Sequence, residues 1–206
     1  KPQQIRVVAR KIADVVQSTH PLIVSIAAGV REQDLEQWLG GNVAIVRCMP
    51  NTPALVQSGA TGLHANSHAI PQQRELAESL LRAVGVTVWV EREELLDAVT
   101  AISGSGPAYF FLLMEAMEMA GKELGLATDT VRLLVEQTAL GAAKLALEAD
   151  AGPGELRHRV TSPGGTTEKA IEVFIQGGFE QLVQRALQAA YNRSRELSEQ
   201  LGKEQE

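Results

Sequence analysis

The chain has one cysteine among its 206 residues, and aromatic side chains make up only 4% of it. A single cysteine excludes an internal disulfide, so we expect Cys48 to be an apolar residue near a strand end, in a protein of a reducing compartment. A catalytic thiol is disfavoured because no obvious base lies near Cys48 in the sequence. Disulfide-stapled secreted domains are therefore excluded as a class.

Basic residues are outnumbered, with 19 Lys and Arg against 25 Asp and Glu and a formal net charge of −6. No long run of Lys or Arg offsets that charge, so nucleic acid is excluded as a partner. The hydrophobic content of 45% and the charged content of 21% lie near globular averages and indicate neither disorder nor a membrane span. No signal peptide is visible. We expect a cytoplasmic protein of one or two domains.

Metal-ligand spacing and the glycine-rich G-x-G-x-x-G turn are both missing from the sequence. The histidines His20, His64, His68 and His158 have no ligand-like spacing, so we expect no metal site. The chain opens on an amphipathic helical pattern at Gln3–Ser18, where an alternating α/β pattern would first place a strand. We therefore expect the sequence to be a fragment that lacks the first βαβ units.

The pattern of apolar residues divides the chain into two regimes. Up to about Val90, short apolar runs alternate with helical periodicity. The expected strands are Leu22–Ile26, Val43–Cys48, Gly62–Ala65 and Val86–Val90, and the expected helices are Gln3–Ser18, Arg31–Leu39 and Gln72–Val84. From Leu95 onward only helical patterns occur, at Pro107–Leu124, Asp129–Glu148, Glu155–Val160, Thr167–Gln176 and Phe179–Leu201. The sequence predicts half of a doubly wound sheet over residues 1–96 and an all-helical domain over residues 97–206.

Two helices of the second half have apolar faces broad enough for partner helices. Pro107–Leu124 repeats apolar residues with a four-three spacing, and Asp129–Glu148 combines an apolar stripe with small residues such as Ala142. One interpretation is an intramolecular core. The other is a symmetric dimer of interleaved helices, which would bury faces that five helices without a sheet cannot cover alone.

Residues 160–167 have the sequence V-T-S-P-G-G-T-T and come directly before an expected helix. The first N–H groups of a helix have no intrahelical acceptor, and Gly164 and Gly165 let a ligand approach the main chain. The positive end of the helix favours a carboxylate, and the hydroxyls of Ser162 and Thr167 can fix its orientation. The alternative interpretation is an ordinary Ser/Thr cap with glycines in the turn.

Three loops stand where strands end, which is where open α/β sheets bind their ligands. They are Lys1-Pro2-Gln3, Ala27-Ala28-Gly29 and Met49-Pro50-Asn51-Thr52-Pro53. The small side chains of the second loop would let a flat cofactor ring or a ribose lie against the main chain. In the third loop, two prolines restrict the backbone around Asn51, which favours a role in a cofactor site. Ordinary turn chemistry is the alternative for the first two.

Two further stretches belong with these segments: Arg47-Cys48-Met49, which leads into the third loop, and Ser103-Gly104-Ser105-Gly106-Pro107-Ala108-Tyr109. Together with the three loops and residues 160–167, they closely resemble pyrroline-5-carboxylate reductase in order and spacing over all 206 residues. The resemblance implies a Rossmann-type α/β domain, partial here, followed by a helical domain through which members form intertwined homodimers, often assembled further. It also implies NAD(P)H-dependent reduction of 1-pyrroline-5-carboxylate to L-proline, the last step of proline biosynthesis. NADPH is the expected cofactor and NADH the alternative.

The resemblance assigns roles to individual residues of this sequence. Thr167 is expected to hydrogen-bond the ring nitrogen of the substrate and so to be the catalytic residue. The residues expected to hold the substrate are Val160, Ser162, Gly164, Gly165, Thr166 and Thr167. Those expected to hold the cofactor are Lys1, Pro2, Ala27, Ala28, Gly29 and Asn51.

Two other functions are open at the level of sequence. A hydroxyacid dehydrogenase of the same layout would supply a lysine base from the first long helix of the second half, but that helix has only Lys122, near its end. A noncatalytic helical dimerisation module with a remnant sheet would also explain the missing glycine-rich turn. The fragment by itself is expected to bind NADPH poorly and to show little reductase activity.

Overall fold

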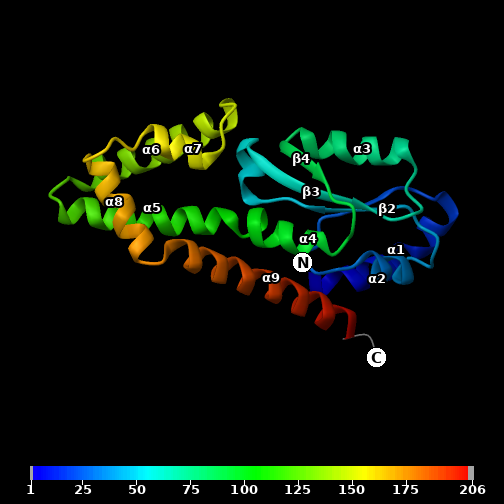
Figure 1. Cartoon of the computed structure of the whole chain (residues 1–206). Coiled ribbons are helices and arrows are strands. Elements are labelled where there is room, and N and C mark those ends of the chain that lie inside the picture. Colours follow the sequence, from blue (N-terminus) through cyan, green and yellow to red (C-terminus); the bar gives the residue numbers. More distant parts are fainter. Residues whose placement is uncertain (1, 204–206) are drawn as a thin grey trace. The chain divides into compact units, whose positions relative to one another are not determined.

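A four-stranded sheet organises the first part of the chain in the computed structural model, which describes residues 2–203 (Figure 1). The strands are β1 (Ile23–Ser25), β2 (Ile45–Met49), β3 (Gly59–Ala65) and β4 (Gly85–Trp89), hydrogen-bonded in that order. Each lies within a few residues of a strand expected from the sequence. The alternation of short apolar runs was therefore a sound guide to where strands form.

The sheet is mixed. β1 pairs parallel with β2 and β3 pairs parallel with β4, but β2 and β3 run antiparallel, with Met49 opposite Gly62. The expectation of half a doubly wound sheet is therefore wrong at β3. A parallel connection takes a dozen or more residues and usually a helix, and here only the short 3₁₀ helix η1 (Thr52–Val56) joins β2 to β3.

Helices cover both faces of the sheet, with α1 and α2 on one side and α3 on the other (Figure 1). Their bounds are α1 (Pro2–Thr19), α2 (Glu32–Trp38) and α3 (Pro71–Arg82). One buried cluster joins Leu35 of α2 to Ile45, and a second joins Ala77 of α3 to Val46 and Leu63. The successive residues Ile45 and Val46 thus point to opposite faces of β2, as the pleat of a strand requires.

After β4 the chain forms a short helix, α4 (Leu95–Val99), that continues as the π-helical turn η2 (Thr100–Gly104). Val99 lies against β3 at Gly62, where a Cβ atom would come within 2.7 Å of Val99 Cγ1. The Thr100 hydroxyl donates to the carbonyl of Leu96 at 2.7 Å. None of this segment was predicted, because a helix of five residues has too few turns to display a period.

The rest of the described chain is helical, as expected. The helices are α5 (Gly106–Glu123), α6 (Thr128–Glu148), α7 (Pro153–Arg159), α8 (Thr166–Gln176) and α9 (Phe179–Lys203). Gly125 and Gly178 follow the ends of α5 and α8 with φ of 95° and 72°, a left-handed conformation that glycine adopts without steric cost.

The chain forms two compact units. Unit 1 comprises Lys1–Pro107 and Ala186–Glu206, and unit 2 comprises Ala108–Arg185. The sequence placed its boundary at residue 96, where strand patterns stop, whereas α4, η2 and the last turns of α9 are parts of unit 1. The apolar period of α9 marks it as a helix but carries no information about which sheet or helix it packs on.

Candidate active site

Residues 160–165 form the turn between α7 and α8 in unit 2, and Thr166 and Thr167 begin α8. The Thr161 hydroxyl donates to the carbonyl of Arg157 at 2.6 Å, and the N–H of Gly165 donates to the carbonyl of Ser162 at 3.0 Å. Gly164 has a φ of 74°, in the left-handed region that favours glycine. All the residues predicted to hold the substrate therefore lie on this turn or at the start of α8.

Helix α8 begins directly after this turn. Its N-cap is Gly165, which has no side chain to satisfy the first N–H groups, and the first backbone bond into the helix is from Lys169 to the Gly165 carbonyl at 3.3 Å. Thr166 is exposed and Thr167 is half-buried. A helix start without a side-chain cap is a ready anion-binding site, because its N–H groups and the helix dipole both favour negative charge.

A carboxylate from the chain itself already contacts this turn. The N–H of Gly164 donates to Glu168 Oε2 at 2.7 Å. The sequence analysis missed Glu168, although an acidic residue three positions after an N-cap is a known signal for a side chain that folds back over the helix start. The turn can therefore accommodate a carboxylate. The N–H of Gly164 can donate to the carboxylate of a ligand only when the Glu168 side chain moves away.

The loop of Ala27, Ala28 and Gly29 follows β1 in unit 1. The N–H of Ala27 lies 3.4 Å from Ser25 Oγ, and Gly29 has a φ of 75°. Ala28 and Gly29 line a cavity of about 350 Å³ together with Thr100, Ser105 and residues of α9. Pro2 lies in the first turn of α1, and Lys1 lies outside the described residues.

Asn51, after β2, makes two side-chain hydrogen bonds within unit 1. Its Oδ1 accepts the N–H of Ala60 at 2.9 Å, and its Nδ2 donates to the carbonyl of Ser103 at 3.1 Å. The amide thus joins the end of β2, the start of β3 and η2. In this structure Asn51 stabilises the framework around the loop, and contact with a cofactor stays a prediction.

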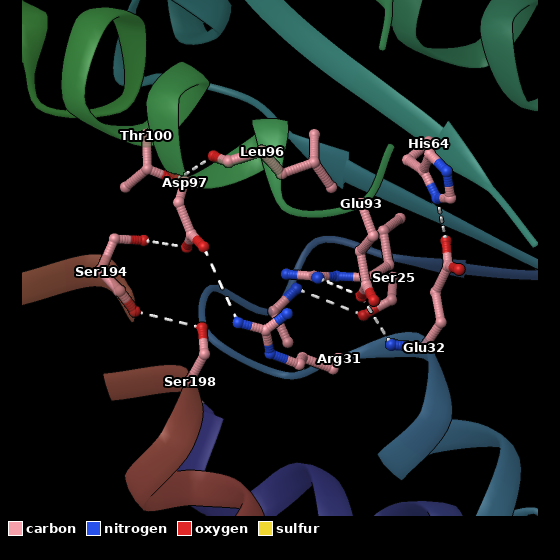
Figure 2. A network of polar contacts seen from close by, with 12 residues as sticks. Ser25, Arg31, Glu32, His64, Glu93, Leu96, Asp97, Thr100, Ser194 and Ser198 are labelled. Carbon is pink, nitrogen blue, oxygen red and sulfur yellow. Dashed lines mark hydrogen bonds and ion pairs between the residues drawn. The ribbon is translucent and has the colours of Figure 1, made fainter. Parts of the chain in front are cut away.

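A buried network of charges lies at the same end of the sheet (Figure 2). Glu93 pairs with Arg47 of β2 and accepts the backbone N–H of Glu32 at 2.7 Å. Glu32 Oε1 lies 2.6 Å from His64 Nδ1, and this hydrogen bond raises the pKa of His64 above its usual value. The network fixes the start of α2, which directly follows the Ala27–Gly29 loop.

A second set of polar contacts joins α4 to α9 (Figure 2). The Ser194 hydroxyl donates to Asp97 Oδ1 at 2.6 Å, and Arg31 Nη2 lies 3.9 Å from Asp97 Oδ2. One turn further along α9, the Ser198 hydroxyl donates to the carbonyl of Ser194 at 3.1 Å. Asp97, Ser194 and Ser198 are all buried, so these bonds are shielded from water.

Cys48 and the histidines supply no further chemistry. Burial raises the pKa of the Cys48 thiol to about 12, so it is protonated at neutral pH and a poor nucleophile. Across residues 2–203, no group of three or more His, Cys, Asp or Glu side chains is arranged to hold a metal ion.

The residues at the carboxyl ends of β1 and β2 fit the nicotinamide end of a dinucleotide. The Ala27–Gly29 loop has no large side chains, its glycine is left-handed, and a cavity opens beside it. Ligands of open α/β sheets bind in this position, and small residues let a flat ring approach the main chain. The fit concerns this end only, because the glycine-rich turn that holds a pyrophosphate does not occur in these 206 residues.

Comparison with known proteins identifies the family. Residues 93–197 match the profile described as pyrroline-5-carboxylate reductase dimerisation. The chain is 55% identical over 202 residues to pyrroline-5-carboxylate reductase of Pseudomonas aeruginosa, covering 98% of this chain and 74% of that protein. A soybean (Glycine max) enzyme of the same name is 40% identical, with 96% and 71% covered.

Solved structures agree. A pyrroline-5-carboxylate reductase from Coxiella burnetii superimposes with a TM-score of 0.92 at 50% identity, covering 96% of this chain and 73% of that one. A pyrroline carboxylate reductase from Plasmodium falciparum with NADP bound gives a TM-score of 0.88 at 30% identity, with 96% and 77% covered. These likenesses extend over both the sheet and the helices. The chain therefore belongs to the pyrroline-5-carboxylate reductase family.

Proposed function

We propose that this protein reduces 1-pyrroline-5-carboxylate to L-proline with NADPH, the last step of proline biosynthesis, with NADH as the alternative reductant. The observation that carries the proposal is the 55% identity to an enzyme of that name across 98% of the chain. The uncapped helix start and the small-residue loop add physical support, since the reaction needs a site for a carboxylate and a site for a flat ring.

The cofactor, when bound, supplies the hydride. In this proposal the nicotinamide end lies against Ala27, Ala28 and Gly29, with Asn51 and the segment of Lys1 and Pro2 completing the site. The small side chains leave the main chain accessible. The two hydrogen bonds of Asn51 hold the end of β2 and the turn η2 in fixed positions.

The turn of residues 160–167 binds the substrate in this proposal. The N–H groups at the start of α8, with the hydroxyls of Ser162 and Thr166, hold the carboxylate, and the exposed side chain of Val160 contacts the apolar ring. The Thr167 hydroxyl donates to or accepts from the ring nitrogen, which gains a proton as the imine is reduced. One helix start can address both groups, because a five-membered ring keeps its carboxylate and its nitrogen close together.

The helical part serves as a homodimer interface, which the family profile over residues 93–197 names as its role. A groove of about 1060 Å³ on unit 2 is lined by Phe110, Phe111, Leu140 and Ala143 among others. The stretch Leu95–Glu123 is long and apolar enough to cross a membrane, although length and composition alone are weak evidence for a span. We assign this apolar face to a second copy of the chain, with further assembly of dimers and a cytoplasmic location as parts of the proposal.

Replacing Thr167 tests the assignment of chemistry. In an active full-length enzyme, Thr167→Ala should lower turnover of 1-pyrroline-5-carboxylate by about 10²–10⁴-fold, the range for a positioned hydrogen-bonding or proton-transfer group. Thr167→Ser keeps the hydroxyl and should retain much more activity. Both should melt close to wild type, because alanine and serine are tolerated in a first helical turn.

Thr161→Ala is the matched control, because it deletes a hydroxyl of the same turn that bonds only the carbonyl of Arg157. It should keep wild-type turnover. Normal turnover in Thr167→Ala would remove Thr167 from the mechanism, and a large drop in its melting temperature would make its role structural.

A further inference from the structure

We propose that Asp97 and Ser194 are positioning residues for NADPH: their buried hydrogen bond fixes α9 against the Ala27–Gly29 loop and so sets the shape of the cofactor site. Neither side chain is assigned a contact with the cofactor. The inference rests on the proposed function, because it takes the loop after β1 as the place where the nicotinamide end binds.

The bond between Asp97 and Ser194 is short and shielded. Ser194 Oγ lies 2.6 Å from Asp97 Oδ1, and the two residues are only 9% and 8% exposed. Hydrogen bonds to a carboxylate are roughly twice as strong as those between neutral groups. Arg31, the residue directly before α2, lies 3.9 Å from the other carboxylate oxygen and offsets part of its charge. Asp97 therefore joins α4, α9 and the segment that follows the cofactor loop.

Helix α9 lies directly on Gly29. A Cβ atom at Gly29 would come within 3.1 Å of Leu201 Cδ1, 3.6 Å of the backbone nitrogen of Ser198 and 3.7 Å of the carbonyl carbon of Leu197. The Leu201 side chain is the nearest neighbour, and the α9 backbone at Leu197 and Ser198 lies only about half an ångström further away, so little space is left for α9 to move toward the loop. A displacement of α9 is thus passed on to Gly29, whose φ of 75° already places it in a conformation that few other residues adopt.

Ser194, which donates this hydrogen bond, also lines a cavity. The cavity of about 350 Å³ is bounded by Ala28 and Gly29 on one side and by Ser194 and Leu197 of α9 on the other, with Ser105 also lining it. The distance between these two walls depends on where α9 sits. Because Asp97 holds Ser194 from α4, losing the bond frees the helix to shift and changes the width of the cavity beside the cofactor loop.

The experiment compares NADPH binding and kinetics in Ser194→Ala with wild type, both in the full-length enzyme. We expect the Kd for NADPH, measured by isothermal titration, to rise about tenfold, and the KM for NADPH to rise with it. A tenfold effect is well below the roughly 10²-fold loss of rate that a misplacement of about 1 Å can cause. The KM for 1-pyrroline-5-carboxylate should stay within about twofold, since the turn of residues 160–167 is unchanged.

Three further variants isolate the contact. Ser198→Ala removes a hydroxyl that is also buried on α9 but donates to the Ser194 carbonyl rather than to Asp97, so its Kd for NADPH should match wild type. Ser194→Thr keeps the hydroxyl and should bind NADPH more tightly than Ser194→Ala. Asp97→Asn keeps the volume and an acceptor oxygen but loses the charge, so we expect about a threefold rise in Kd.

The outcomes separate the inference from its premise. A Ser194→Ala variant with a lower melting temperature but an unchanged Kd for NADPH overturns the positioning role. If that variant does not fold, Asp97→Asn decides in the same way, because a folded Asp97→Asn protein with wild-type Kd also overturns it. A full-length wild-type enzyme that does not oxidise NADPH with 1-pyrroline-5-carboxylate would instead contradict the proposed function.

Discussion

Unit 1 and unit 2 differ in how they cover their apolar side chains. Among the described residues, the buried apolar side chains lie in unit 1, except Val131 and Val135 of α6 in unit 2. Unit 2 instead has large apolar side chains exposed on both long helices. They include Phe110, Phe111, Leu112, Leu133, Leu134, Leu140 and Leu145. In unit 1, helices on both faces of the sheet bury its apolar side chains, whereas the long helices of unit 2 leave many of theirs exposed to solvent.

The comparison teaches where the stability of each unit comes from. Burying a leucine or phenylalanine contributes about 1.5–3 kcal/mol, so a unit that leaves many of them in water forgoes most of its hydrophobic stabilisation. Unit 1 gains that energy within one chain. Unit 2 gains it on association, which fits the dimerisation profile that covers it. Folding and assembly of unit 2 are therefore expected to be one process.

The largest effect is expected from a charge placed in the open groove of unit 2. Ala143 of α6 lines this groove, and Ala143→Glu would bury an unpaired carboxylate in the dimer at a cost of several kcal/mol. Sedimentation equilibrium should then show monomer or aggregate in place of dimer.

Gln137→Glu, on the same helix but not on the groove lining, is the control and should leave the dimer intact. A stable Ala143→Glu dimer would mean that this groove is not the interface, and the contrast between the two units would lose its explanation.

A smaller effect is expected where the core of unit 1 has no room. A Cβ atom at Gly62 of β3 would lie 2.7 and 2.9 Å from the two methyl carbons of Val99. Gly62→Ala should therefore lower the free energy of unfolding by about 1–3 kcal/mol, as overpacking does. Adding Val99→Ala should recover part of the loss in a denaturant titration. A Gly62→Ala variant as stable as wild type would show that α4 is packed loosely against β3.

The matching change in unit 2 is Gly141→Ala. Within one chain nothing lies within 4 Å of the added methyl group, so the helix propensity of alanine should stabilise α6 by up to about 1 kcal/mol. Thermal melts at several protein concentrations measure this gain in stability. Weaker dimerisation would instead place Gly141 against the partner copy.

The smallest expected effect is a pH dependence confined to unit 1. The hydrogen bond to Glu32 raises the pKa of His64 in the folded protein, so its stabilisation is complete below about 6.5 and is lost as pH rises through the higher folded value. The melting temperature should fall by a few degrees over that window, and His64→Gln should abolish the change. His158→Gln in unit 2 should preserve it. A wild-type melting temperature that does not change over this pH window would rule out a contribution from His64.

Periodicity in the sequence predicted most elements and the two-part organisation. It located β1 to β4 and the helices, because alternating and helical apolar spacings reflect burial that each element needs by itself. It could not give the direction of β3, since direction depends on the short connection through η1 and not on the strand's own residues. The sheet is consequently mixed where the pattern suggested it would be parallel.

The candidate site was predictable to the level of the segment. Glycines and hydroxyls around Ser162 and Thr167 mark a helix start open to an anion, and this is a local signal. Contacts made by side chains across long sequence separations left no such signal: Ser194 bonds to Asp97, 97 residues earlier. The Glu168 contact with Gly164 is local, and the position of Glu168 three residues after the N-cap could have indicated it.

The discontinuity of unit 1 has a consequence for the order in which the protein can form. A ribosome makes residues 1–107 first, then all of unit 2, and only then the part of α9 that packs on Gly29. Until those last turns emerge, the Asp97 carboxylate has no Ser194 hydroxyl and the backbone of Gly29 has no helix over it. The sheet can form early in synthesis, but its final helix arrives last, so the edge that we propose for the nucleotide is completed only after the dimerisation helices have been made.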